Sequence, residues 1–364
     1  MTRRLSRACT LVCSILLLVV GLMGVPQETE AGMIGKKEEV NMGKEVAVQL
    51  ENQYGVVQNP ELQDRVNRIG QSLVAHCDRK DLEYSFKVLN TDDVNALSVP
   101  GGYIYVFKGL VDFMPSDDEL AGVLGHEIGH VVKRHTVHQM EKQMALSVLG
   151  IIAAAASGDP GAGIALATTA TQALMAGYSR ADEREADEQG FLLTSKAGYN
   201  PYSIYVTMSK LNDLSVRDGN PGYGLFASHP EPKVRMAKNL KAIEALHIRA
   251  KVTTSKDGST ATVRDGNWSY TFKNTINSDK PEYRADLLAG ALYLVQQRGV
   301  VDDTHFLTVD NDVYSDVYYE DIHLARFYGI DAVGFGSISD CAAAFAAQMQ
   351  GWAQQNKNSV VKAA

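Results

Sequence analysis

Residues 126–130 read His-Glu-Ile-Gly-His, and residues of these types at this spacing can hydrolyse a peptide bond with the help of a metal ion. An α-helix turns by about 100° per residue, so His126 and His130 would lie on one face, one turn apart. Two imidazoles at this spacing can bind one Zn²⁺, and Glu127 would act as general base toward the attacking water. The alternative is a core helix whose histidines only form hydrogen bonds.

The residues around this motif predict the helix that carries it. Ser116 and Glu119 form a capping box, which is typical of a helix start. The small Gly122, Gly125 and Gly129 lower helix propensity but would let another element come close to the metal-binding face. Apolar residues recur at helical spacing and predict a buried face: Leu120, Val123, Leu124, Ile128 and Val131.

Two further histidines follow the motif. On an uninterrupted helix, His135 and His138 would project about 180° and 120° away from His126. We therefore expect them to have solvated or helix-end roles rather than to bind the metal. The third protein ligand must come from elsewhere in the chain.

The segment that begins at Ser179 offers this ligand. Ser179 can cap a helix on which Glu183 and Asp187 lie one turn apart. Glu183 could complete a His₂Glu site, and Asp187 could accept a hydrogen bond from a ligand imidazole and so fix its orientation. A solvated acidic helix is the alternative for this segment.

Four blocks of sequence carry a resemblance to a known group of peptidases: residues 95–106, 126–130, 179–187 and 228–235. Their order and spacing resemble those of the membrane-associated and periplasmic gluzincins. This group is typified by CAAX-prenyl proteases, HtpX heat-shock peptidases, mitochondrial Oma-type proteases and periplasmic BepA-like proteases. The resemblance covers about residues 40–245. It implies a zincin-like domain, one Zn²⁺ per chain and Glu183 as the third ligand.

The resemblance also suggests roles in the fourth block. His229 would lie near the metal, where it could stabilise the oxyanion that forms on the substrate carbonyl. It could instead coordinate zinc in a closed, self-inhibited state, as in the BepA-like branch. Arg235 would anchor this loop by hydrogen bonds or help to polarise the site.

The first block predicts a strand at residues 103–107, because it is aromatic and β-branched. In similar zincins such a strand borders the cleft and pairs with an extended substrate. The resemblance therefore implies that Asn95, Gly102 and Tyr103 bind the substrate. An ordinary buried strand preceded by a turn is the alternative.

The N-terminus has the features of a targeting segment. Basic residues precede an almost wholly apolar run at 8–25, and small residues follow before Gly32. We expect residues 1–31 to be a signal peptide and the protein to be exported to the periplasm. If the segment were not cleaved, it would anchor the chain in a membrane. The net charge of −8, with no basic block beyond the N-terminus, argues against a nucleic-acid partner.

Two other features leave alternatives open. The apolar runs at 145–156 and 162–176 are too short to span a bilayer, and they predict either a lid that meets membrane-bound clients or a buried helical hairpin. After processing, only Cys77 and Cys341 remain. They could pair in an oxidising compartment, or they could be two separate buried thiols.

The whole pattern predicts an α+β protein with a mainly helical, zincin-like domain at 32–249, which contains a small sheet, and an accessory α+β domain of unknown role at 250–364. The sequence beyond residue 250 lacks the 34-residue periodicity of TPR repeats. The expected elements are helices at 37–75, 201–214, 232–248, 281–298, 319–328 and 339–356, a strand meander at 252–272 and a strand at 306–309.

These observations predict a zinc metalloendopeptidase. By resemblance, its substrates would be misfolded or misassembled cell-envelope proteins, and it could associate with a membrane surface. Two alternatives remain: a zinc-containing chaperone or assembly factor with little proteolysis, and a processing protease for one membrane-associated client. The complete HExxH motif argues against the chaperone, because a purely structural site would not need Glu127.

Overall fold

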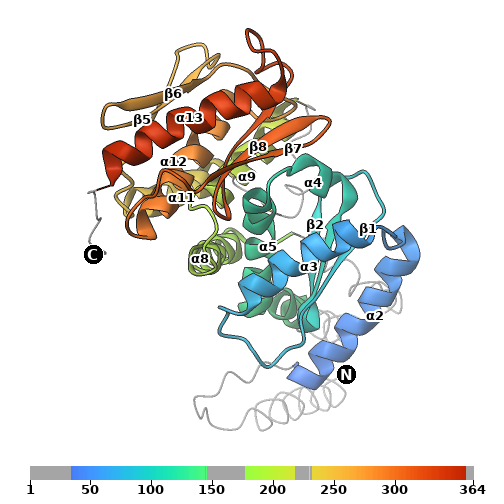
Figure 1. The fold of residues 1–364 in the computed structure, drawn as a ribbon. Helices are drawn as coiled ribbons and strands as arrows, with labels where there is room; N and C mark the ends of the chain where they lie inside the picture. Colours follow the sequence, from blue (N-terminus) through green and yellow to red (C-terminus); the bar gives the residue numbers. More distant parts are fainter. Residues whose placement is uncertain (1–33, 144, 146–176, 218–228, 230–231, 358–364) are drawn as a thin grey trace, which may run out of the picture. The chain divides into compact units, whose positions relative to one another are not determined.

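The computed structural model describes residues 34–143, 145, 177–217, 229 and 232–357 (Figure 1). Within this part, Lys36–Ala364 belongs to one compact unit, described here by itself. The expected signal peptide at 1–31 and most of the apolar segment at 145–176 lie outside the described residues. No helix in the described ranges is both long and apolar enough to cross a membrane.

Two helices replace the single helical stretch expected at 37–75. α2 (Lys36–Tyr54) ends at Gly55, whose φ of 72° is in the left-handed region that favours glycine. α3 (Pro60–Val74) begins after Asn59, whose side chain accepts a hydrogen bond from the Leu62 amide. The helical prediction is therefore confirmed, with a break that the Gly and Asn-Pro residues explain.

A three-stranded sheet follows, consisting of β1 (Ser85–Leu89), β2 (Ala96–Val99) and β3 (Tyr103–Phe107). β3 lies in the middle, parallel to β1 and antiparallel to β2. The strand predicted at 103–107 is confirmed, but the expectation that it pairs with substrate is wrong. Both of its edges are already hydrogen-bonded, so only β1 and β2 have an edge to offer.

The HExxH motif lies in the C-terminal half of the next long helix. α4 (Lys108–Phe113) leads to α5 (Asp117–Val132), which begins with the predicted capping box between Ser116 and Glu119. α8 (Arg180–Lys196) begins with a second capping box, formed by Ser179 and Asp182. α9 (Ser203–Arg217) and α11 (Pro232–Glu244) complete the helical part, close to the predicted bounds.

Glycines of α5 allow α8 to approach closely. A Cβ atom added at Gly129 would lie 2.6 Å from the Ala186 carbonyl oxygen, and one added at Gly125 would lie 3.2 Å from that of Gly190. At Gly122 the added atom would meet the backbone of Ser203, at the start of α9, at 2.9 Å. The small residues therefore let α8 and α9 pack against α5, as the sequence suggested.

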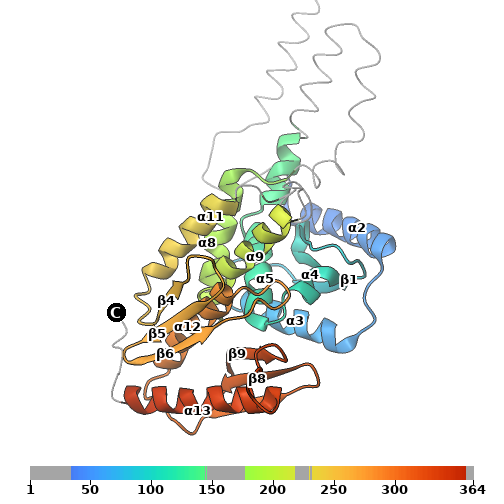
Figure 2. The ribbon, with the colours of Figure 1, turned by 90° about the horizontal axis from the view of Figure 1, so that it is seen from above.

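The C-terminal part contains two antiparallel sheets and two helices (Figure 2). β4 (Lys251–Thr254), β5 (Ala261–Asp265) and β6 (Trp268–Phe272) form the predicted meander. α12 (Pro281–Gln297) follows, and α13 (Ile338–Asn356) packs on the second sheet. That sheet contains β7 (Phe306–Asp310), β8 (Tyr314–Tyr319) and β9 (Ile322–Tyr328).

The predicted helix at 319–328 is wrong, because these residues form the end of β8 and all of β9. Glu320 has a φ of 54°, as a tight hairpin between antiparallel strands requires. In β9, the buried Ile322, Leu324 and Phe327 contact the core, whereas His323 is only partly buried. The segment is short and contains Tyr319, Phe327 and Tyr328, and this aromatic content should have outweighed its apparent helical spacing.

Two main groups of buried apolar side chains form the core. One is built around α3, the first sheet and α5, and the other around α12, α13 and the later strands. Cys77 belongs to the first and Cys341 to the second, and both are buried free thiols. The domain boundary near residue 250 stays a prediction.

A buried lysine connects the two halves. Lys210 Nζ of α9 lies 2.5 Å from Glu119 Oε1 at the start of α5 and 2.5 Å from Asp279 Oδ1, just before α12. It also donates a hydrogen bond to the Phe113 carbonyl at 3.1 Å. This contact was not predictable from the sequence, because Lys210 interrupts an apolar helix face and no motif surrounds it.

Candidate metal centre

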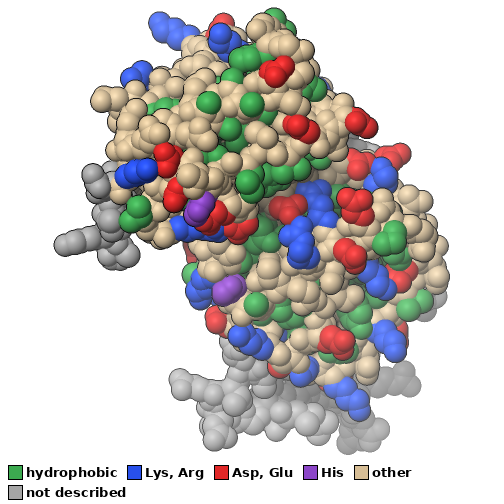
Figure 3. Space-filling model, in the orientation of Figure 1, with side chains coloured by type: hydrophobic (Ala, Val, Ile, Leu, Met, Phe, Trp, Pro, Cys, Tyr) green, Lys and Arg blue, Asp and Glu red, His purple; other side chains and the backbone are tan. Residues whose placement is uncertain are grey.

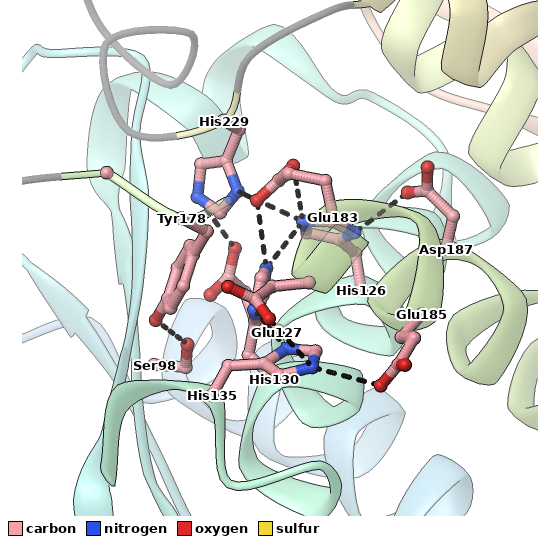
Figure 4. A network of polar contacts seen from close by, with 12 residues as sticks. Ser98, His126, Glu127, His130, His135, Tyr178, Glu183, Glu185, Asp187 and His229 are labelled. Atoms are coloured by element: carbon pink, nitrogen blue, oxygen red, sulfur yellow. Dashed lines mark hydrogen bonds and ion pairs between the residues drawn. The ribbon is translucent and has the colours of Figure 1, made fainter. Parts of the chain in front are cut away.

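α5 holds the two motif histidines as the helical spacing predicts. His126 Nε2 and His130 Nε2 lie 3.0 Å apart, and both side chains are buried. Burial lowers the pKa of His130 well below its ordinary value, which favours the neutral imidazole that metals bind. Figure 4 shows both rings directed toward the same point as Glu183 and His229.

α8 supplies two carboxylates on one face. Glu183 Oε1 lies 3.4 Å from His130 Nε2, and Glu183 Oε2 lies 3.7 Å from His126 Nε2. One turn later, Asp187 Oδ1 accepts a hydrogen bond from His126 Nδ1 at 2.9 Å. Burial alone would raise the pKa of Glu183, but the nearby His229 and His130 outweigh it and hold this pKa far below its ordinary value.

His229 comes from a distant part of the chain and completes the cluster. Its Nδ1 lies 2.9 Å from Glu183 Oε1 and 3.1 Å from His126 Nε2. The four side chains place one possible ligand atom each within 4.8 Å of the others. We call His126, His130, Glu183 and His229 the metal-site group.

Arg235 of α11 holds both carboxylates of α8. Its guanidinium donates two hydrogen bonds of 2.7 Å to the Asp187 carboxylate and forms an ion pair with Glu183 Oε2. Burial raises the pKa of an unpaired aspartic acid, but the Arg235 hydrogen bonds lower that of Asp187. Asp187 therefore remains ionised and can orient His126.

Glu127 is fully buried and has no hydrogen-bond partner on either carboxylate oxygen among the described residues. The nearest basic nitrogen is His229 Nε2, which lies 3.7 Å from Glu127 Oε1 and is too far away for a hydrogen bond. A buried carboxylate without partners is costly, so its presence here requires a functional reason.

The solvated role expected for His135 is wrong, because this side chain is buried, although it is not one of the metal-site group; His138 is exposed as predicted. α5 ends at Val132, and Arg134 has a left-handed φ of 57°. The chain therefore does not continue the helix, and His135 turns inward until its Nδ1 lies 2.9 Å from His130 Nδ1. The 180° projection assumed a continuous helix, and no residue of the sequence indicated the break.

Tyr178 is a further site residue that the sequence did not reveal. Its ring stacks on His130, with the ring centres 3.7 Å apart. Its hydroxyl forms hydrogen bonds with Thr136 at 2.8 Å and with Ser98 of β2 at 3.1 Å. Tyr178 thus links the second motif histidine to an edge strand. Its position directly before the Ser179 cap was the only available signal.

The three residues expected to bind substrate make structural contacts of their own. Gly102 has a φ of 94°, and a Cβ atom there would lie 2.8 Å from the Glu83 carbonyl oxygen. Tyr103 packs with the apolar cluster beneath α2. Asn95 accepts a hydrogen bond from the Phe107 amide at the end of the sheet. These contacts account for the residue types at the three positions. That the three residues bind substrate stays a prediction.

The donor set fits a metal ion such as zinc. His126 donates its Nδ1 proton to Asp187, so the neutral ring directs an Nε2 lone pair toward the other three donors. Imidazole nitrogens and a carboxylate oxygen are ordinary zinc ligands, and the orphaned Glu127 lies beside them. Two histidines one turn apart, a glutamate between them and a second glutamate from another helix together define a metallopeptidase of the gluzincin class.

Comparison with known proteins identifies the family. Residues 60–244, just over half of the chain, match peptidase family M48, and the chain belongs to this family. The resemblance found in the motifs is therefore confirmed, as is the mainly helical domain of this peptidase family, and four residues of the site could hold a metal ion.

Several curated proteins are similar to this chain. The beta-barrel assembly-enhancing protease of Escherichia coli K12 is 28% identical over 208 residues, which cover 55% of this chain and 42% of that protein. Metalloprotease YcaL of the same organism is 34% identical over 47% of this chain and 63% of its own length. The mitochondrial metalloendopeptidase OMA1 of Schizosaccharomyces pombe is 32% identical over 48% of this chain and 50% of its length. The similarity thus spans only part of each relative.

Proposed function

We propose that this protein is a zinc-dependent endopeptidase in which His126, His130 and Glu183 hold one Zn²⁺. The observation that supports this most is the buried, unpartnered Glu127 carboxylate beside a convergent set of imidazoles and a carboxylate. A structural metal site would not require such a carboxylate, because all its ligands are supplied by the other residues.

The chain's own residues would perform the proton transfers. A bound zinc ion supplies Lewis-acid polarisation and acidifies water. Glu127 takes the proton of the attacking water and delivers it to the leaving amine. Asp187 fixes the ring of His126, and Arg235 keeps Asp187 and Glu183 in place.

We infer that His229 closes the site in the arrangement seen here. Catalytic zinc sites keep one of four positions open, and His229 adds a fourth protein donor to the three expected ligands. A closed state would limit proteolysis until His229 leaves the site. The alternative is that His229 stabilises the oxyanion, which requires it to remain in the site during catalysis.

The substrates we propose are misfolded or misassembled proteins of the cell envelope, met in the periplasm or at a membrane surface. The support comes from the similarity of just over half of this chain to a protease named for enhancing beta-barrel assembly. An extended peptide could pair with β2, because β2 has β3 on one side only in the described structure and its Ser98 contacts Tyr178 beside the site.

Replacing Glu127 tests the mechanism. Glu127→Gln removes the general base while preserving shape, so we expect metal content to be retained and cleavage of unfolded casein to fall at least about a hundred-fold. Glu188→Gln, an exposed substitution of the same type on α8, should leave both unchanged. Unchanged cleavage by purified Glu127→Gln would defeat the proposal.

Replacing His229 distinguishes its two roles. If His229 closes the site, His229→Ala should raise the initial rate of casein cleavage and weaken zinc retention during dialysis against a chelator. The exposed His138→Ala serves as the matched control. A loss of activity with unaltered zinc retention would instead assign His229 to transition-state stabilisation.

A further inference from the structure

A groove separate from the metal-site group is lined by residues of, or next to, α9, α11, β4 and α12. Figure 2 shows these four elements near one another. Its volume is about 620 Å³, and none of the four metal-site residues lines it. Its walls include Tyr202, which precedes α9, Tyr205 of α9, and three carboxylates from α11 and α12: Glu244, Glu282 and Asp286.

Asp286 is a buried acid that has no partner. Only 7% of its surface is exposed, and no hydrogen bond or ion pair joins it to another described residue. The strongest charge acting on it is Glu282, one turn earlier on α12, which has the same sign. Burial, aided by Glu282, raises the pKa of Asp286 to about 8. A cation in the groove would remove this penalty.

Besides the exposed His247, the groove is lined by two basic side chains, and both of these bind other groups. Arg249 binds both carboxylate oxygens of Asp265 at 2.9–3.0 Å. Lys251 Nζ donates to the Ile248 carbonyl at 2.9 Å. Neither contributes to the field at Asp286, so the charge of the acidic wall is not balanced.

The aromatic wall suits an organic cation. The rings of Tyr202 and Tyr205 lie 6.4 Å apart and are inclined at 72°. Both tyrosines line the same groove as Asp286, and burial and, after it, the charge of Asp286 raise the pKa of both. Two inclined aromatic faces beside a carboxylate are the arrangement that recognises ammonium groups.

We propose that this groove binds a primary alkylammonium group, with Asp286 as its counter-ion and Tyr202 and Tyr205 as its aromatic walls. The group could be the side chain of a lysine in a polypeptide or the end of a free polyamine. The groove shares no residue with the metal site, so this proposal does not depend on the proposed peptidase mechanism.

The test is a calorimetric titration of the full chain at pH 9, where Asp286 is largely ionised and the lysine ammonium largely protonated. The probes are Nα-acetyl-lysine methylamide, its Nε-acetylated analogue and spermidine. We expect the charged lysine derivative or spermidine to bind and the Nε-acetylated probe not to bind. Tighter binding of the lysine derivative would identify a polypeptide source, and tighter binding of spermidine a free polyamine.

Two groove variants and one control complete the test. Asp286→Asn should weaken binding about ten-fold or more, and Tyr205→Leu should weaken it several-fold. Asp312→Asn, an exposed substitution between β7 and β8, should leave the affinity unchanged. Equal affinity of the wild type and a folded Asp286→Asn protein would overturn the proposal, as would absence of binding or equal binding of the Nε-acetylated probe. If Asp286→Asn fails to fold, Glu282→Gln and Tyr205→Leu provide the same comparison.

Discussion

Asp286 makes the protein less stable as the pH rises, because its buried environment raises the pKa of this carboxyl. Its pKa is about 8 in the folded protein and about 4 in an unfolded chain, so the folded state binds more protons between these values. The protonated carboxyl makes its full contribution to the free energy of unfolding below about pH 4. This contribution is lost progressively as the pH rises toward about 8, and it does not change further at higher pH.

Asp286→Asn should therefore unfold with the same free energy as the wild type near pH 4 and be more stable at pH 8, by up to about 5 kcal/mol. Urea unfolding of both proteins at several pH values measures the difference. Because every other titrating group is common to the two proteins, a difference that is independent of pH would contradict this account.

The positions of single residues in the metal site were predictable where helix geometry alone determines the direction of the side chain. The rotation per residue placed His126 and His130 together, and a capped helix presented Glu183 and Asp187 on one face. The inward turn of His135 depends on the backbone of Arg134, and the stacking of Tyr178 depends on tertiary contacts. Neither has a sequence pattern. The position of His229 followed only from the family resemblance.

At the scale of elements, the close approach of α5 and α8 brings their ligands together. Gly129→Ala should favour the isolated helix by about 1 kcal/mol, but its methyl group would overlap the Ala186 carbonyl. Because backbone cannot yield as a flexible side chain does, α8 must move and carry Glu183 away from His130. We expect lower zinc affinity and lower peptidase activity.

Gly351→Ala on α13 is the matched control for this substitution. A Cβ atom at Gly351 meets no other atom within 4 Å, so the alanine should leave zinc binding unchanged and the protein equally or more stable. Zinc titration with a competing chelator measures both variants. An undiminished zinc affinity in Gly129→Ala would show that α8 is not positioned by this contact.

The sequence predicted most elements because strong local signals marked their starts and ends. Capping residues marked α5 and α8, and turn residues separated β4, β5 and β6. β9 was misread because its buried positions, 322, 324, 325 and 327, are also compatible with a helix face. The order of the first sheet was not predictable either, because strand pairing joins residues that no local pattern connects.

At the scale of the whole molecule, Lys210 connects the peptidase helices with the C-terminal half. Lys210→Met would leave Glu119 buried without its cation, and removing one member of a buried ion pair typically costs about 3–5 kcal/mol. We expect a corresponding loss of unfolding free energy, measured by urea denaturation. The double variant Lys210→Met/Glu119→Gln should recover part of it. If the single variant were as stable as the wild type, the two halves would not depend on this contact.

The expectation that nucleic acid is not a partner stays a prediction from the sequence. On the face shown in Figure 3, basic and acidic side chains are interspersed and form no continuous basic stripe. With a net charge of −8, the chain offers no electrostatic attraction for a phosphate backbone.

The shortness of β2 limits how much of a client's sequence the protein can read. β2 has four residues, so a peptide paired along it would be held for only about 13 Å. Side chains of an extended peptide point alternately to the two sides, which leaves about two of them facing the enzyme. Two positions carry too little information to single out one protein among many. Discrimination would then depend on which chains expose a free, extended segment, that is, on the folding state of the client.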